Sequence, residues 1–290
     1  MSVEPPAIAF RDLTRDFPIG LRGYKLRALE KVSFEIPKSG IFGLLGPNGS
    51  GKSTAIKIVL GLLSPSSGAC EVFGRTAGTL ESKNRVGYLP ENPHFPAFLA
   101  GRELVEYFAG LSGISGKKAK EQTEAVISLV GMDHSALRKV GTYSKGMLQR
   151  IGLAQALVHD PDILILDEPL SGLDPAGTQE VINLLIELRK RNKTILISSH
   201  LLSRVEEICD RVAILHKGRL IKEGPLSELL ESESPNQTLE VSGIESKEDL
   251  NKLVQRLQDE NVKVESFGNV KRTLDEVFLD IVAEDKEGNQ

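Results

Sequence analysis

Hydrophobic and polar residues change their spacing along this chain, and each spacing predicts a different kind of element. Between residues 8 and 34, apolar and polar residues alternate around a basic, glycine-containing interruption at residues 20–25. This alternation predicts an antiparallel sheet with a loop in it. From residue 41 to residue 224, short apolar runs alternate with helical segments, which predicts a parallel sheet with helical crossovers. The predicted fold class is therefore α/β.

One stretch, from about residue 98 to residue 160, departs from this alternation. Apolar residues recur there at helical spacing, as at Leu104, Phe108 and Leu111, and no strand pattern interrupts them between residues 100 and 141. We therefore expect an all-helical insertion in the α/β domain. Near its end, Ser144 is a good N-cap for a further helix.

The C-terminal part reads as a smaller unit behind a linker. Residues 231–237 are polar and contain a proline, as linkers do. Beyond them the pattern is βαβα, with strands and helices expected at residues 238–241, 247–257, 262–265 and 274–282. The chain is thus expected to have one large domain over residues 1–230 and a small α+β appendage over residues 238–290.

Composition narrows the class of protein without naming its partners. Of 290 residues, 40% are hydrophobic and 26% charged, and the net charge of -4 is spread over both signs, so no nucleic-acid partner is expected. The two cysteines, Cys70 and Cys209, lie far apart and fit a reducing cytosol. The N-terminus lacks a signal-peptide pattern, and no apolar run reaches the ~18 residues of a membrane span. We expect a cytoplasmic protein whose membrane span, if its work requires one, belongs to another chain.

The strongest chemical signal is the stretch GPNGSGKS at residues 46–53, which satisfies the phosphate-loop pattern G-x-x-x-x-G-K-[ST]. An apolar strand pattern precedes it and a helix pattern follows, so backbone N–H groups and the helix N-terminus can surround a triphosphate. Lys52 is expected to reach the outer phosphates and the Ser53 hydroxyl to bind Mg²⁺. The expected nucleotide-binding residues are Gly46, Pro47, Asn48, Gly49, Ser50, Gly51, Lys52, Ser53 and Thr54.

Acidic residues and a histidine follow two later strand patterns. In residues 163–169, ILILDEP, four apolar residues precede two acids, which places the carboxylates at the C-terminal end of a central strand. Asp167 is expected to hold Mg²⁺, and Glu168 to orient and deprotonate an attacking water. His200 ends the next strand pattern at the same edge, where we expect it to contact the terminal phosphate. Taken alone, the Asp-Glu pair is equally typical of a solvated turn.

The order of these motifs resembles that of ATP-binding cassette (ABC) ATPases. A phosphate loop, a serine-glycine signature, an Asp-Glu strand, the sequence SGLD at residues 171–174 and a switch histidine follow one another between residues 8 and 224. The resemblance implies a P-loop NTPase core with an antiparallel β subdomain, and ATP and Mg²⁺ as cofactors. It also implies a homodimer or heterodimer of cassettes around two ATP molecules.

The signature itself departs from the LSGGQ usual in that family. Ser144 and Gly146 match the family's serine and second glycine, whereas its other positions hold Tyr143, Lys145 and Met147. The resemblance implies that Ser144 and Gly146 act on ATP held by the phosphate loop of the second subunit. The alternative is an ordinary capped helix.

Two more site residues come from the resemblance. Glu91 stands where the family usually has a glutamine, which implies contact with Mg²⁺ or the attacking water. The family's adenine-stacking aromatic aligns best with Phe17, and Tyr24 competes because the loop between them looks inserted. An ordinary core or surface role for either aromatic stays open.

The leading interpretation is the ATP-hydrolysing subunit of an ABC transporter, peripheral on the cytoplasmic face of the cell membrane, which drives a separate integral membrane permease. The YSKGM signature, the LPE at residues 89–91 and the TLDEVF at residues 273–278 are similar to the type 2 exporter group. A soluble ABC ATPase acting on ribosomes or nucleic acid is the alternative. The appendage is expected to support packing or dimer formation, or else to bind substrate or gate the permease.

Overall fold

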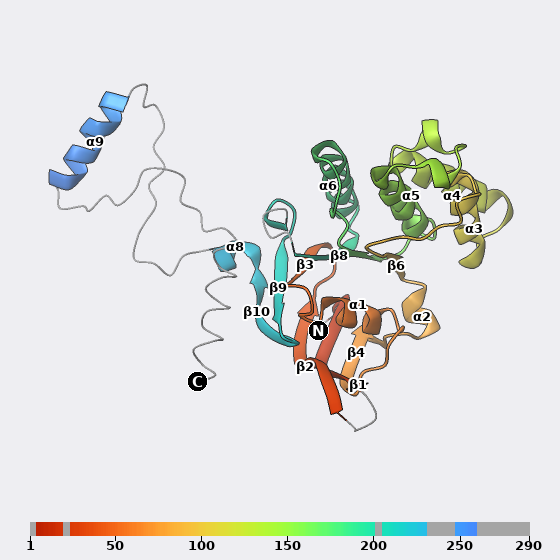
Figure 1. Ribbon diagram of the computed structural model, residues 1–290, viewed down its shortest axis with the longest axis horizontal. Coiled ribbons are helices and arrows are strands. Elements are labelled where there is room, and N and C mark those ends of the chain that lie inside the picture. Colours follow the sequence, from red (N-terminus) through yellow and green to blue (C-terminus); the bar gives the residue numbers. More distant parts are fainter. Residues whose placement is uncertain (1–3, 20–23, 201–204, 231–246, 260–290) are drawn as a thin grey trace.

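The computed structural model describes residues 4–19, 24–200, 205–230 and 247–259. In these residues the strands form two sheets, and helices pack beside them (Figure 1). The four-stranded sheet has the order β2-β1-β4-β5, and the six-stranded sheet has the order β10-β9-β3-β8-β7-β6. The predicted α/β class with an antiparallel subdomain is confirmed.

The four-stranded sheet is antiparallel throughout. Its strands are β1 (Ile8–Ile19), β2 (Tyr24–Ile36), β4 (Ser67–Val72) and β5 (Arg75–Thr76). The last two lie within residues 41–224, which were predicted to form a parallel sheet, and for these two strands the prediction was wrong. The reason is a short period-two pattern in β4, where Cys70 and Val72 face the core while Ala69 is exposed, so the strand completes the second edge of β1.

The six-stranded sheet is mostly parallel and ends in one antiparallel strand. Its strands are β3 (Gly40–Leu45), β6 (Val86–Leu89), β7 (Ile163–Asp167), β8 (Thr194–Ser199), β9 (Arg211–His216) and β10 (Arg219–Pro225). The predicted parallel sheet extended to residue 224, but β10 returns antiparallel to β9 through a tight turn at Lys217 and Gly218, both with positive φ. A two-residue connection is too short for a parallel crossover.

Three of the described helices form a group of their own. In Figure 1, α3, α4 and α5 lie together on one side of the molecule, away from β9 and β10, as an all-helical insertion. The helices are α1 (Lys52–Val59), α2 (Leu80–Lys83), α3 (Gly101–Leu111), α4 (Gly116–Leu129), α5 (Lys145–Leu157), α6 (Pro175–Lys190), α8 (Leu226–Leu230) and α9 (Lys247–Asp259). Short 3-10 turns at Asp133–Ser135 and Val140–Thr142 lead into α5.

The appendage is described only in part. Helix α9 lies where the helix after residue 246 was expected. The expected linker at residues 231–237, both strands and the final helix lie outside the described residues. Within the described part of the chain, no helix combines the length and apolar character that a membrane crossing requires.

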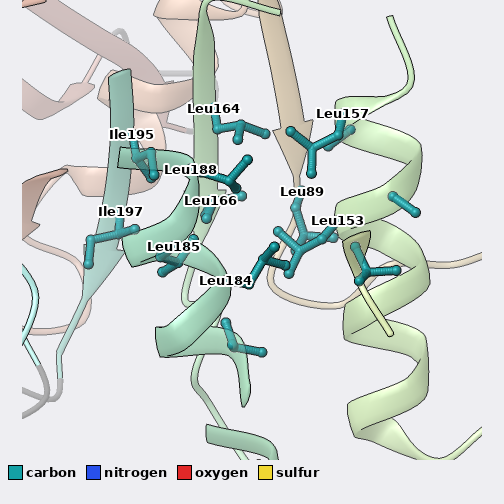
Figure 2. Close-up of a cluster of buried hydrophobic side chains, with 14 of the residues drawn as sticks. Leu89, Leu153, Leu157, Leu164, Leu166, Leu184, Leu185, Leu188, Ile195 and Ile197 are labelled. Atoms are coloured by element: carbon teal, nitrogen blue, oxygen red, sulfur yellow. The ribbon is translucent and has the colours of Figure 1, made fainter. Parts of the chain in front are cut away.

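Buried leucine and isoleucine side chains fix the parallel strands between helices. Figure 2 shows side chains of β6, β7 and β8 meeting those of α5 and α6. Each such side chain, fully buried, favours the folded state by about 1.5–3 kcal/mol. On the other face, Phe34 stacks between Phe10 and Phe42 and joins the two sheets. This packing holds the C-terminal ends of β3, β7 and β8 side by side, and the candidate site lies there.

Candidate active site

A cavity of about 360 Å³ opens at the C-terminal ends of β3, β7 and β8. It brings together residues that lie far apart in the sequence, most of them among the predicted site residues. The lining residues are Phe17, Leu26, Ala28, Asn48, Gly49, Ser50, Gly51, Lys52, Ser53, Thr54, Glu91, Asp167, Glu168 and His200. The cavity thus has a phosphate-loop side, an acidic side and an apolar side.

The phosphate loop connects β3 to α1 through glycines that no other residue could replace without strain. Gly46, Gly49 and Gly51 have φ of 147°, 80° and 112°. A Cβ on Gly46 would lie 2.2 Å from the carbonyl oxygen of Leu215 and 2.6 Å from Ser50 Oγ. The loop is therefore closed tightly against the neighbouring strand, with its backbone N–H groups at the N-terminus of α1.

Lys52 is buried inside this loop. Its Nζ donates to the carbonyl oxygens of Gly46 at 2.6 Å and Pro47 at 3.2 Å. Burial lowers the pKa of Lys52, and the charges of Glu168, Asp167 and Glu91 oppose that shift. Phosphate oxygens are stronger partners for an ammonium group than carbonyls are, so this side chain fits a triphosphate held by the loop.

Buried Ser50 supports the same fit. Its Oγ is shielded from solvent, and no hydrogen-bond partner is found for it among the described atoms. A buried hydroxyl without a hydrogen-bond partner destabilises the fold, and an acceptor oxygen of a ligand bound in the loop would offset this cost. The chain's residues therefore suit a phosphate-bearing ligand on this side of the cavity.

Asp167 is the last residue of β7 and Glu168 follows it directly, and both are buried. Ser198 of the neighbouring β8 donates its hydroxyl to Asp167 Oδ1 and accepts a 3.0 Å bond from the backbone N–H of Glu168. Glu168 itself has φ of 50°, in the left-handed region that non-glycine residues seldom adopt. The serine thus fixes both acids against the sheet while their oxygens line the cavity.

The sequence reasoning missed Ser198. Its signal was available, because a serine interrupts the apolar pattern of β8 at the position opposite Asp167. Recognising it required the register of β7 and β8, which single strands do not reveal.

His200 lies directly after β8 and contacts the second acid. Its Nδ1 is 2.8 Å from Glu168 Oε1, with the histidine side chain 41% exposed and the glutamate 8%. The histidine therefore orients the carboxylate of Glu168 and remains partly open to solvent. Glu91 also lines the cavity and is exposed, so the structure brings all four predicted catalytic residues, including Lys52, to one place.

The apolar side of the cavity comes from the antiparallel sheet. Phe17 of β1 and Leu26 of β2 are cross-strand partners, and both line the cavity together with Ala28. The guanidinium of Arg15 lies 4.7 Å from the centre of the Phe17 ring. Tyr24 is 69% exposed and is not among the lining residues. This geometry favours Phe17 over Tyr24 as the base-contacting aromatic, and it adds Leu26 and Ala28, which the sequence reasoning missed.

Ser144 and Gly146 lie apart from this cavity. Ser144 is the N-cap of α5, and its exposed Oγ accepts a 3.3 Å bond from the backbone N–H of Met147. The side chain of Lys145 lies against the turn between β7 and α6, because a Cβ on Gly172 in that turn would lie 2.2 Å from Lys145 Nζ. Within one chain, the structure therefore does not bring the predicted signature residues to the phosphate loop.

Comparison with known proteins shows which proteins share these features. Residues 29–171 match the family described as "ABC transporter". The chain is 44% identical over 208 residues to the uncharacterized ABC transporter ATP-binding protein sll0415 of Synechocystis sp., an alignment covering 71% of this chain and 59% of that protein. It is 36% identical to the uncharacterized ABC transporter ATP-binding protein YhcH of Bacillus subtilis, over 89% of this chain and 92% of that protein.

Two further similarities extend the comparison. The bacitracin transport ATP-binding protein BcrA of Bacillus licheniformis is 42% identical, over 70% of this chain and 66% of that protein. Among solved structures, one titled as the ATP-binding subunit of an ABC transporter superposes with a TM-score of 0.71. It covers 95% of this chain and 99% of that one at 24% identity, which shows likeness of fold.

Proposed function

Because this chain belongs to the family of ABC transporter ATP-binding proteins, we propose that it is the ATP-hydrolysing subunit of an exporter. In this proposal it uses Mg²⁺, pairs with a second cassette around two ATP molecules, and drives a separate membrane permease from the cytoplasmic face of the membrane. Residues 1–230 form the nucleotide-binding domain, residues 231–237 a linker, and residues 238–290 an appendage that supports packing.

One observation carries the proposal. Lys52, Asp167, Glu168 and His200 come from separate segments and converge on one cavity beside the phosphate loop. Each supplies a different function needed for cleavage of a phosphoanhydride: a fixed positive charge, a metal ligand, a base and a hydrogen-bonding partner for that base. Convergence of these groups favours hydrolysis over simple nucleotide binding.

The geometry suggests how the residues divide the work. The loop N–H groups and Lys52 hold the phosphates, and Ser53 and Asp167 are the residues that would hold Mg²⁺. When bound, Mg²⁺ neutralises charge on the phosphate oxygens. Glu168 takes a proton from a water molecule whose oxygen forms a bond to the terminal phosphorus, while the bond from that phosphorus to the ADP oxygen breaks.

His200 and Ser198 keep this base in position. His200 Nδ1 contacts Glu168 Oε1, and the Ser198 hydroxyl accepts from the Glu168 N–H. Preorganised contacts of this kind reduce the reorganisation needed at the moment of reaction. Glu91, which is exposed on the cavity wall, is proposed to contact Mg²⁺ or the attacking water.

The second cassette accounts for the exposed signature corner. Ser144 and Gly146 lie at the N-terminus of α5, outside the cavity of their own chain. The first-turn N–H groups of a helix favour anions. We propose that Ser144 and Gly146 face the triphosphate bound to the other chain, which is either a second copy of this chain or a related cassette.

The names of relatives support transport, and export in particular. BcrA is named for bacitracin transport, and a relative from Burkholderia orbicola, 36% identical over 78% of its length, is named a Nod factor export ATP-binding protein. These names describe those proteins. For this chain they support an exporter of unspecified cargo.

The proposal is tested with purified protein and with membranes. Wild type is expected to hydrolyse Mg·ATP, and Lys52→Met to lose both tight ATP binding and turnover. From detergent-solubilised membranes, the tagged chain is expected to carry with it a protein with several membrane spans. Co-purification with ribosomes instead would contradict the transport role, and turnover unchanged by Lys52→Met would contradict the assignment of the site.

A further inference from the structure

Three segments from distant parts of the sequence meet tightly behind the phosphate loop. A Cβ on Gly51 of the loop would lie 2.7 Å from Leu29 Cδ2 and 2.8 Å from the carbonyl oxygen of Ala28, both in β2. A Cβ on Gly218, in the turn between β9 and β10, would lie 2.7 Å from the same Ala28 oxygen. The loop, the turn and β2 therefore pack tightly against one another, with no space for a side chain on either glycine.

Backbone hydrogen bonds connect the same three segments in series. The N–H of Gly218 donates to the carbonyl oxygen of Ser50 at 3.0 Å. The N–H of Glu30 in turn donates to the carbonyl oxygen of Gly218 at 2.8 Å. A shift of β2 relative to the phosphate loop must therefore break or stretch one of these bonds.

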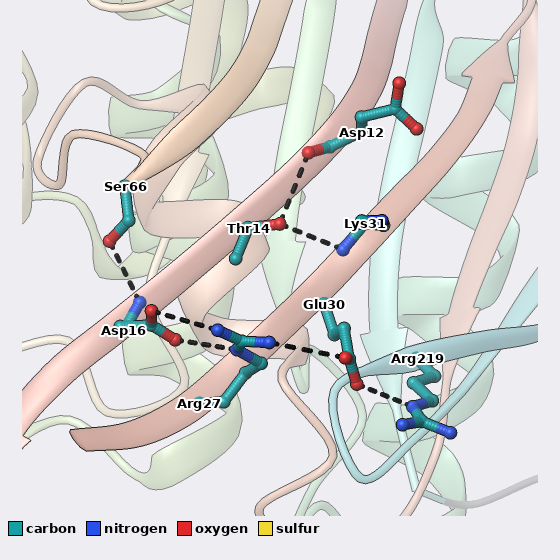
Figure 3. A network of polar contacts seen from close by, with 8 residues as sticks. All are labelled: Asp12, Thr14, Asp16, Arg27, Glu30, Lys31, Ser66 and Arg219. Atoms are coloured by element: carbon teal, nitrogen blue, oxygen red, sulfur yellow. Dashed lines mark hydrogen bonds and ion pairs between the residues drawn. The ribbon is translucent and has the colours of Figure 1, made fainter. Parts of the chain in front are cut away.

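A chain of ion pairs continues from this junction along the antiparallel sheet (Figure 3). Arg219 Nε, just past the turn, contacts Glu30 Oε2 at 2.7 Å. Glu30 Oε1 contacts Arg27 Nη1 at 3.3 Å, and Arg27 reaches both carboxylate oxygens of Asp16 at 2.9 and 3.3 Å. The two arginines lower the pKa of Glu30, Arg219 more than Arg27, so this carboxylate stays charged.

The far end of this chain lies beside the apolar wall of the cavity. Asp16 and Arg27 are cross-strand partners, and the next pair in the register is Phe17 and Leu26. Because side chains alternate across a strand, the Asp16–Arg27 ion pair lies on one face of this ribbon, and Phe17 and Leu26 lie on the other. The network therefore fixes, from behind, the backbone that presents Phe17 and Leu26 to the cavity.

We propose that Glu30 and Arg219 are positioning residues for the nucleotide base: they hold the Phe17-bearing ribbon at a set distance from the phosphate loop. The inference deepens the proposed function, since it assumes that the cavity binds an adenine nucleotide with its base against Phe17. In this inference Glu30 and Arg219 contact no nucleotide atom. They change the affinity for the nucleotide only through the position of Phe17.

An ordinary surface ion pair is the competing explanation. Such pairs contribute little to stability, and their removal would leave nucleotide affinity unchanged. A second competing explanation is that loss of the ion pair loosens the whole phosphate loop. This would weaken nucleotide binding whether or not Phe17 contacts the base. A double-mutant cycle between Arg219 and Phe17 separates these cases.

The experiment titrates ADP with Mg²⁺ into the full-length chain by calorimetry. ADP serves as the probe because it is not hydrolysed. The variants are Arg219→Gln, Glu30→Gln, Phe17→Ala and the two double variants that combine Phe17→Ala with each of the others. Arg75→Gln, which removes the exposed ion pair to Glu81 at 3.2 Å, is the matched control.

Arg219→Gln and Glu30→Gln are each expected to raise the Kd for ADP about three- to fivefold, with Arg75→Gln unchanged. In the Phe17→Ala background, the same substitutions are expected to change the Kd by less than about 1.5-fold. Arg219→Lys is expected to restore part of the affinity, because a lysine keeps the charge but not the planar contact.

Unchanged ADP affinity in Arg219→Gln and Glu30→Gln would overturn the inference, and so would the same fold-loss with and without the Phe17 ring. An unaltered Kd in Phe17→Ala would overturn it as well. A wild-type chain that binds no ADP would instead refute the proposed function, and this failure is visible before any variant is measured.

Discussion

Two polar regions of this molecule, the C-terminal edge of the parallel sheet and the start of α5, differ in how many of their polar contacts lie within the chain. At the C-terminal edge of the parallel sheet, Asp167, Glu168 and Lys52 are buried, and each has hydrogen-bond partners within the chain or lies among opposite charges. At the start of α5, Ser144 is exposed, and its recorded contact is the ordinary one of a helix cap.

The two regions differ in whether partners within the chain compensate for the burial of polar groups. Burying charged groups is unfavourable unless partners compensate, and the sheet edge has those partners already. The α5 corner has no such burial to compensate, so its residues gain a special role only from something placed against them. A buried polar site is therefore a property of one chain, whereas the proposed function makes the signature corner a site only in an assembly.

The largest effect is expected from Glu168→Gln, which tests the buried edge. Loss of the carboxylate removes the proposed base, and general-base catalysis contributes about 10²–10⁴-fold, so ATP turnover should fall by about that factor. ATP binding should persist, because Lys52 and the loop are intact. Steady-state phosphate release measures the turnover, and calorimetric titration measures the ATP affinity. Glu187→Gln, on the exposed face of α6, serves as the control. Turnover near that of wild type would remove Glu168 as the base.

The next effect is expected from Ser144→Arg, which tests the exposed corner. Ser144 does not line the cavity of its own chain, so ADP affinity should stay within about twofold, while turnover falls about 100-fold because a donor to the triphosphate is lost. Ser115→Arg, at the exposed N-cap of α4, is the matched control and should leave turnover unchanged. If both substitutions left hydrolysis intact, the corner would have no part in catalysis.

The sequence was sufficient for features that depend on local order. The phosphate loop lies between β3 and α1, as its flanking patterns predict, Asp167 is the last residue of β7, and His200 directly follows β8. These positions need only the rule that parallel strands present their C-terminal ends at one edge. The same local logic identified Ser144 as an N-cap.

Features that depend on strand register were not predictable in this way. Ser198 acts on both acids because β8 pairs with β7 in one particular register, and Leu26 reaches the cavity because it pairs with Phe17. Strand β10 reverses after a two-residue turn, although its residues alone resemble those of other strands. The catalytic and binding roles of all these residues stay predictions until activity is measured.

A smaller effect is expected from Ser198→Ala, which removes a supporting contact of the buried edge. Asp167 loses a hydroxyl donor, whereas the Glu168 N–H keeps its 3.2 Å bond to the Ser198 carbonyl oxygen. A hydrogen bond to a charged group contributes about 1.5–3 kcal/mol. For a contact that only supports Asp167 we expect the lower end of this range, which corresponds to a fall in turnover of about tenfold. Phosphate-release assays at saturating Mg²⁺ measure this. An unaltered rate would show that β8 does not position the acids.

The smallest effect concerns the charge environment of the same edge. Burial, and secondarily the charge of Asp167, raises the pKa of Tyr88 to about 12. A group whose folded-state pKa is raised favours the folded state below the unfolded pKa, near 10, and loses this contribution as the pH rises to about 12. Tyr88→Phe should therefore show a shallower decline of Tm between pH 10 and 12 than wild type. Identical slopes would contradict a raised pKa at Tyr88.

The most direct test of the comparison is a crystal structure of Glu168→Gln with Mg·ATP. The account predicts two chains facing each other, with Ser144 of each within hydrogen-bond distance of the terminal phosphate held by Lys52 of the other. Ser144 facing solvent in every assembly, with ATP bound by one chain alone, would contradict it.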